Sequence, residues 1–122
     1  MTWVNPNNSI KISAVQDDFV KALLREKFAE KNVHILELAI ALGLRRNVRE
    51  KLVPPTQDSA KVGQFDPEGV LEVVIMARYG NLSETDRLKA VQEHAVAGLN
   101  ILSEIVQESN GLLDVESLLA EL

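Results

Sequence analysis

The sequence predicts an all-α fold, in which about five helices pack around an aliphatic core as a single domain spanning residues 1–122. The chain has 122 residues, of which 46% are hydrophobic and 25% charged, which is typical of one globular domain. Aromatic residues make up only 4%, so the core must consist mainly of Leu, Val, Ile and Ala. Helix-start signals and apolar residues at helical spacing recur along the chain.

The first helix is expected after a short irregular stretch. Residues 1–9 are rich in Asn and contain a Pro, which predicts an irregular arm. Ile10–Ser13 alternates apolar and polar residues, a pattern that permits a short N-terminal strand. Ser13 and Gln16 then form a capping-box pattern, which predicts a helix over about residues 14–30. Its apolar face carries Phe19, Val20, Leu23, Leu24 and Phe28.

The second helix is expected to be the central one. His34–Leu44 is apolar on nearly all sides, as in helices that are buried all round. Gly43 is interpreted as its left-handed C-cap. Residues 47–65 contain two adjacent prolines and a glycine, and they are predicted to form one long loop.

Three further helices are predicted in the second half of the chain. Residues 66–68 (Asp-Pro-Glu) are a strong helix start, which predicts a helix from residue 67 to about Tyr79. Ser83 and Asp86 mark the start of the next helix, and Asp114 marks the start of a short last one.

The helix after Ser83 carries an apolar seam with spacings of three and four residues. Such a seam is typical of a helix packed along a partner helix. Ala95 and Gly98 are small, so the partner can approach closely there. The stripe is broader than one neighbour covers, which predicts a homodimer or higher oligomer. The predicted interface residues are Leu88, Val91, Ala95, Gly98, Leu99, Leu102 and Ile105.

Several function classes receive no support from the sequence. The chain has no cysteine, so it has no disulfide, thiolate metal site or cysteine nucleophile. It has no nucleophile elbow, phosphate-binding loop or dinucleotide fingerprint, so we expect a protein that is not an enzyme, with no catalytic residues and no cofactor. Without a leader or an apolar run of the ~18 residues that a membrane span needs, we expect a cytoplasmic protein without membrane contact.

The two histidines suggest a metal site as a minor alternative. His34 and Glu37 lie one helical turn apart, and His94 follows Glu93 on another helix. Facing helices can hold a metal with such residues, but the paired Glu-x-x-His signatures of these sites are missing. We therefore expect no metal, and histidines that serve as caps or lie at the surface.

One dense run of cations is the candidate nucleic-acid contact. Arg45, Arg46, Arg49 and Lys51 lie within seven residues, a pattern that can bind phosphates. The same cations also suit the negative end of the preceding helix. The net charge of −5 favours this second interpretation, because it repels nucleic acid on average.

The order of the first elements suggests another alternative. A short strand followed by two helices, 14–30 and 34–43, is the order of ribbon-helix-helix DNA-binding proteins. In these proteins strands from two chains pair and enter the major groove. Lys11 and Ser13 would then contact the bases. The strand is short and the first helix long for such a unit, so a dimeric DNA-binding regulator is the alternative interpretation.

Two segments resemble a known family. Residues 28–52 (FAEKNVHILELAIALGLRRNVREKL) resemble the small accessory proteins of bacterial DNA phosphorothioation (Dnd) and related defence systems, through an Ala-rich apolar helix ending Ala-Leu-Gly-Leu before a basic tail. Residues 94–106 (HAVAGLNILSEIV) are similar to their C-terminal helix. The resemblance implies a non-catalytic accessory role beside DNA modification or restriction, through protein partners or DNA. It carries over no functional residue.

Overall fold

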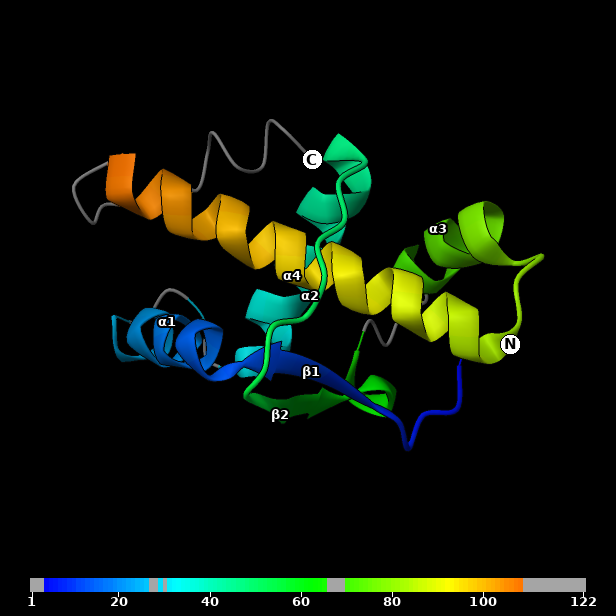
Figure 1. Cartoon of the computed structure of the whole chain (residues 1–122), viewed down its shortest axis with the longest axis horizontal. Coiled ribbons are helices and arrows are strands. Elements are labelled where there is room, and N and C mark those ends of the chain that lie inside the picture. The colour runs from blue at the N-terminus through cyan, green and yellow to red at the C-terminus, as the bar shows by residue number, and fades with distance from the viewer. Residues whose placement is uncertain (1–3, 27–28, 30, 66–69, 109–122) are drawn as a thin grey trace.

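The computed structural model describes residues 4–26, 29, 31–65 and 70–108, and these form a mostly helical fold with a small sheet (Figure 1). The prediction of a helical protein is therefore confirmed, but the all-α class is wrong because a two-stranded antiparallel sheet is present. In chain order the described elements are β1 (Ser9–Ser13), α1 (Ala14–Arg25), α2 (Asn32–Arg46), β2 (Thr56–Lys61), the short 3-10 helix η1 (Val62–Gln64), α3 (Val70–Tyr79) and α4 (Glu84–Glu108).

The second strand lies inside the segment predicted to be a long loop. β2 pairs antiparallel with β1, from Ser9 opposite Lys61 to Ser13 opposite Thr56, with a register shift between Ile10 and Lys11. The N-terminal strand is thus confirmed, and the continuous loop over 47–65 is wrong. Only one apolar side chain of β2 is buried, so the strand has no alternating pattern by which the sequence could reveal it.

The start of α1 follows the predicted capping box. The Ser13 hydroxyl accepts a hydrogen bond from the Gln16 backbone N–H at 3.2 Å, and the Gln16 side chain accepts one from the Ser13 N–H at 3.5 Å. The helix ends at Arg25 rather than near residue 30, with Glu26 as its C-cap. In the described part of the predicted N-terminal arm, residues 4–8 are irregular and Val4 is buried, whereas Ser9 already belongs to β1.

The central feature is the crossing of α2 and α4, which lie against each other in the middle of the molecule (Figure 1). α2 is buried as predicted, but it continues past Gly43 to Arg46, and Asn47 is the residue in the left-handed conformation. Gly43 is needed for packing instead, because a Cβ there would overlap the His94 backbone carbonyl. Likewise, a Cβ on Gly98 would overlap the backbone of Ala39. The two glycines allow the helices to approach closely.

Of the signals predicted for the last three helices, some lie on described residues and others do not. The Ser83 hydroxyl accepts a hydrogen bond from the Asp86 N–H at 3.2 Å, which confirms the predicted cap of α4. α3 ends at Tyr79 as predicted. The proposed helix start at residues 66–68 and the helix after Asp114 lie outside the described residues.

Candidate functional site

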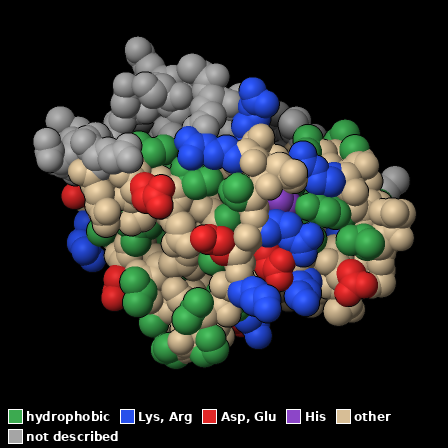
Figure 2. All heavy atoms as spheres, turned by 45° about the horizontal axis from the view of Figure 1, so that its top comes forward, with side chains coloured by type: hydrophobic (Ala, Val, Ile, Leu, Met, Phe, Trp, Pro, Cys, Tyr) green, Lys and Arg blue, Asp and Glu red, His purple; other side chains and the backbone are tan. Residues whose placement is uncertain are grey.

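The predicted cations gather around the C-terminal end of α2. Arg45 and Arg46 form its last turn, and Arg49 follows in the segment that leads to β2. Arg78 of α3, which the sequence did not single out, joins them and donates a hydrogen bond to the Leu44 carbonyl at 3.0 Å. Cations at this position stabilise the negative end of a helix. Figure 2 shows Lys and Arg side chains gathered on one face, with acidic side chains among them.

Arg49 is held by partners within the chain. Its guanidinium contacts the Glu93 carboxylate at 2.7 Å and 2.9 Å, through two different nitrogens. It also lies over the Tyr79 ring, 5.9 Å from the centroid. The hydrogen bond to Glu93 is the main cause that raises the pKa of Arg49. The Glu93 side chain is only 14% exposed, so this pair is partly shielded from water, and Arg49 is less available to an outside anion.

Of the two lysines predicted as nucleic-acid contacts, Lys11 lies on another element and Lys51 follows Arg49 in the same segment. Lys11 lies on β1, and its backbone N–H and carbonyl both form hydrogen bonds with the Gln92 side chain of α4. Lys51 lies in the segment between α2 and β2 and lines a groove beside α4. The sequence placed Lys11 on the possible N-terminal strand, apart from the run of arginines, and it lies on β1.

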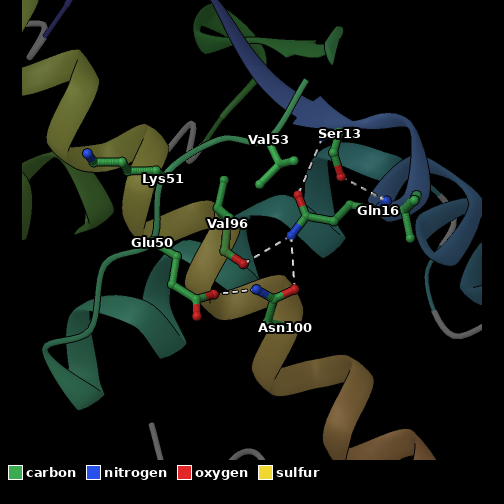
Figure 3. Close-up of a pocket in the computed structure, with 8 residues that line it drawn as sticks. Ser13, Gln16, Glu50, Lys51, Val53, Val96 and Asn100 are labelled. Carbon is green, nitrogen blue, oxygen red and sulfur yellow. Dashed lines mark hydrogen bonds between the residues drawn. The ribbon is translucent and has the colours of Figure 1, made fainter. Parts of the chain in front are cut away.

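The groove beside Lys51 is about 440 Å³ and lies between the start of α1, residues 50–53 and α4 (Figure 3). Val15 of α1 and Val53 both line it, although their side chains are 79% and 64% exposed. Val96 of α4 adds a buried apolar surface. The groove therefore presents valines to the solvent, and burial of such surface is favourable.

The polar lining of the groove is a connected network. The Gln16 side-chain amide, itself buried, donates to the Val96 carbonyl at 3.1 Å and to the Asn100 side-chain oxygen at 3.2 Å. The Asn100 amide in turn donates to the Glu50 carboxylate, which reaches across from the opposite wall (Figure 3). This network connects α1, α4 and Glu50 of the segment between α2 and β2.

A second hollow of about 280 Å³ continues the groove along α4. It shares Glu50 and Asn100 with the first and extends to Arg46, Ile101 and Glu104. Residues 46–53 thus form a wall of both hollows. No sequence pattern marks this surface, because its residues come from three separate segments and most of them are ordinary surface residues. Gln16 was singled out only as a helix cap.

The two histidines lie in different environments. His94 is fully buried, whereas His34 is exposed at the start of α2. The prediction of a capping or surface position therefore holds for His34 and is wrong for His94. Among the residues that the structure describes, no cluster of histidines and acids could hold a metal ion.

The predicted interface residues pack against the core of the same chain. Val91, Ala95, Leu99 and Leu102 are fully buried, and Gly98 packs against Ala39 of α2. Leu88 and Ile105, at the ends of the seam, are partly buried against the same core. The core of the same chain therefore packs against most of this seam, and the homo-oligomer remains a prediction.

The pairing of β1 differs from that of a ribbon-helix-helix protein. One edge of β1 pairs with β2 of the same chain, and Lys11 at the other edge is bonded to Gln92. At Lys11 the edge of β1 opposite β2 is therefore occupied within the chain, whereas the ribbon-helix-helix interpretation requires this strand to pair with the equivalent strand of a second chain. The dimeric DNA-binding regulator remains a prediction.

Comparison with known proteins adds no relative: the sequence matches no family model, and no curated protein or solved structure is significantly similar to it. None of the described helices is long and apolar enough to cross a membrane.

Proposed function

We propose that this protein is a non-catalytic accessory module that acts by binding a partner protein, in a prokaryotic DNA-modification or defence system as the resemblance of residues 28–52 and 94–106 implies. The observation that carries the protein-binding part is the groove lined by Val15 and Val53. Both valines are largely exposed and line the same groove, which also has a polar network. Protein interfaces combine such apolar contacts with hydrogen bonds.

The charges of the groove favour a polypeptide over DNA as its occupant. Its lining contains one cation, Lys51, and one carboxylate, Glu50. A phosphate backbone needs several cations that are available to it. In the neighbouring cluster, Arg49 is paired with Glu93 and Arg78 is bonded to the end of α2. These internal bonds support the helix-capping interpretation of the basic run.

Self-association remains a prediction. The seam proposed for it is filled by α2 and the rest of the core, so a second subunit would have to use another surface. A partner protein of different sequence can bind in the groove without a second self-complementary surface, and this proposal favours such a partner.

The test is co-purification of the full chain with the proteins encoded by its neighbouring genes. The variant Val15→Glu/Val53→Glu places two carboxylates in the groove, and Val73→Glu/Val74→Glu makes the same change on α3. We expect one neighbouring protein to bind the wild type and the α3 variant, and to bind the groove variant at least about tenfold more weakly, since a desolvated charge in an interface is costly.

Two outcomes would contradict this proposal. One is a partner that the groove variant retains and the α3 variant loses. The other is tight binding of wild-type protein to duplex DNA at physiological salt, with a steep salt dependence that Arg45→Ala/Arg46→Ala/Arg49→Ala flattens. That second result would support a DNA-binding accessory protein instead.

A further inference from the structure

A single buried imidazole joins three parts of the molecule. His94 of α4 forms a hydrogen bond of 2.7 Å through Nδ1 with the Val48 carbonyl, and another of 2.7 Å through Nε2 with the Tyr79 hydroxyl of α3. A carbonyl oxygen can only accept, so Nδ1 must carry the hydrogen of the neutral ring. Nε2 is then the acceptor, and the Tyr79 hydroxyl donates to it. The neutral imidazole therefore satisfies both contacts.

Cations surround this imidazole on the elements packed against it. Arg78 on α3 and Arg49 in the segment after α2 both disfavour a positive charge on His94. On α4 itself the neighbouring acid is Glu93, whose carboxylate pairs with Arg49. Burial, first, and then these two guanidinium groups lower the pKa of His94. A protonated His94 would thus add a third positive charge, beside Arg78 and Arg49, at a position that is buried from solvent.

Protonation would also change the hydrogen bonds. The added hydrogen would lie on Nε2 and point at the Tyr79 oxygen, so the hydroxyl would have to turn its own hydrogen away. Water can reach the charged ring only when Tyr79 or the chain around Val48 moves. α3 is well suited to move, because Val73 and Val74 on it are exposed and Ile75 is its one fully buried side chain among those described.

We propose that His94 is an acid-sensitive latch, which in its neutral form holds α3 and residues 47–53 against α4 and in its protonated form releases them. Residues 46–53 also form a wall of the groove, so their release would change its shape. The inference rests on the hydrogen bonds and charges around His94, and it stands whatever binds in the groove.

The direction of the pH dependence follows from the lowered pKa. The latched form binds the proton less readily than a form in which His94 is exposed and titrates near its ordinary pKa of about 6.5. The latch is therefore fully closed above that pH and weakens as the pH falls below it. Between pH 7.5 and 5.5 the population of the open form should rise by up to about tenfold.

Amide hydrogen exchange of the full chain at these two pH values tests the proposal. After correction for intrinsic exchange, we expect the amides of α3 and residues 47–53 to open about tenfold more often at pH 5.5. The amides at the α2–α4 crossing should change much less. His34→Gln, which removes the exposed histidine, is the matched control and should keep the effect. His94→Gln cannot take up a proton and should abolish it.

If His94→Gln does not fold, proton NMR of the wild type decides the matter. The chain has only two histidines, so His34→Gln identifies the His94 ring signals. We expect the His94 ring signals to titrate below the ordinary histidine pKa of about 6.5, together with a shift of the Tyr79 ring signals. A His94 that titrates near 6.5, or α3 amides that exchange equally at both pH values, would overturn the proposal.

Discussion

The helix pair α2–α4 and the helix α3 are both apolar in sequence, but they are packed very differently. At the α2–α4 crossing, Gly43 and Gly98 bring the backbones together, and Leu99 is fully buried. On α3, Val73 is 68% exposed and Val74 is 42% exposed. Apolar content alone therefore does not determine whether a helix is buried. A helix is buried where small residues let a neighbour approach, and α3 has no such contact along its outer face.

The largest expected effect is at the close crossing. Gly98→Leu should abolish cooperative folding, because even a Cβ at this position overlaps the backbone of Ala39. Extra methylenes in a packed core typically cost about 1–3 kcal/mol, and here a whole side chain meets backbone that cannot move aside. Glu104→Leu, at an exposed position of the same helix, is the control and should change the free energy of unfolding by less than about 0.5 kcal/mol. Urea unfolding followed by circular dichroism measures both. A wild-type midpoint for Gly98→Leu would show that the helices do not cross as closely as described.

The next largest effect separates the two regions directly. Leu99 and Ile75 are both fully buried, and truncation of such a side chain to Ala typically costs about 2–5 kcal/mol. Leu99→Ala should lower the global stability by that amount, since the α2–α4 crossing is the core. Ile75→Ala should instead speed hydrogen exchange in α3 with a smaller loss of global stability, because α3 can detach locally. Equal global losses for the two variants would mean that α3 unfolds only with the core.

Much of the fold could be predicted from local signals. The capping boxes and caps at Ser13 and Ser83 are properties of neighbouring residues, and both are present. The central position of α2 followed from its apolar residues on all sides. Gly43 was misinterpreted as a C-cap, because a glycine near a helix end has the same sequence signal whether it ends the helix or admits a neighbour. The structure distinguishes these two roles, because it places the His94 backbone of α4 directly against Gly43.

The candidate site was much less predictable. The run of arginines was visible in the sequence, but Glu93, which pairs with Arg49, and Arg78, which donates to the Leu44 carbonyl at the end of α2, lie far away along the chain. The network of Gln16, Asn100 and Glu50 depends on three segments that the fold brings together. β2 was missed for a similar reason, since a polar strand becomes recognisable only when its partner strand is placed beside it.

A moderate effect is expected where α4 begins beside α3. Ser83→Ala removes the hydroxyl that accepts from the Asp86 N–H, and loss of such a cap costs about 1 kcal/mol. Ser103→Ala, a Ser to Ala change in the interior of the same helix, is a suitable control. Urea titration measures both variants. A larger loss for Ser103→Ala than for Ser83→Ala would contradict the assigned role of Ser83.

The smallest expected effect is on the exposed face of α3. Val73→Ser removes a side chain that is 68% exposed, and Val and Ser have similar helix propensities, so the free energy of unfolding should change by less than about 0.5 kcal/mol. The midpoint of unfolding should also be independent of protein concentration for both variant and wild type, if this face is open to water as in the single chain. Urea titrations at two concentrations, with sedimentation at the higher one, measure this. A wild-type midpoint that rises with concentration, and a Val73→Ser midpoint that does not, would mean that a second copy covers this face of α3. In that case the predicted oligomer would form through α3 and not through the seam of α4.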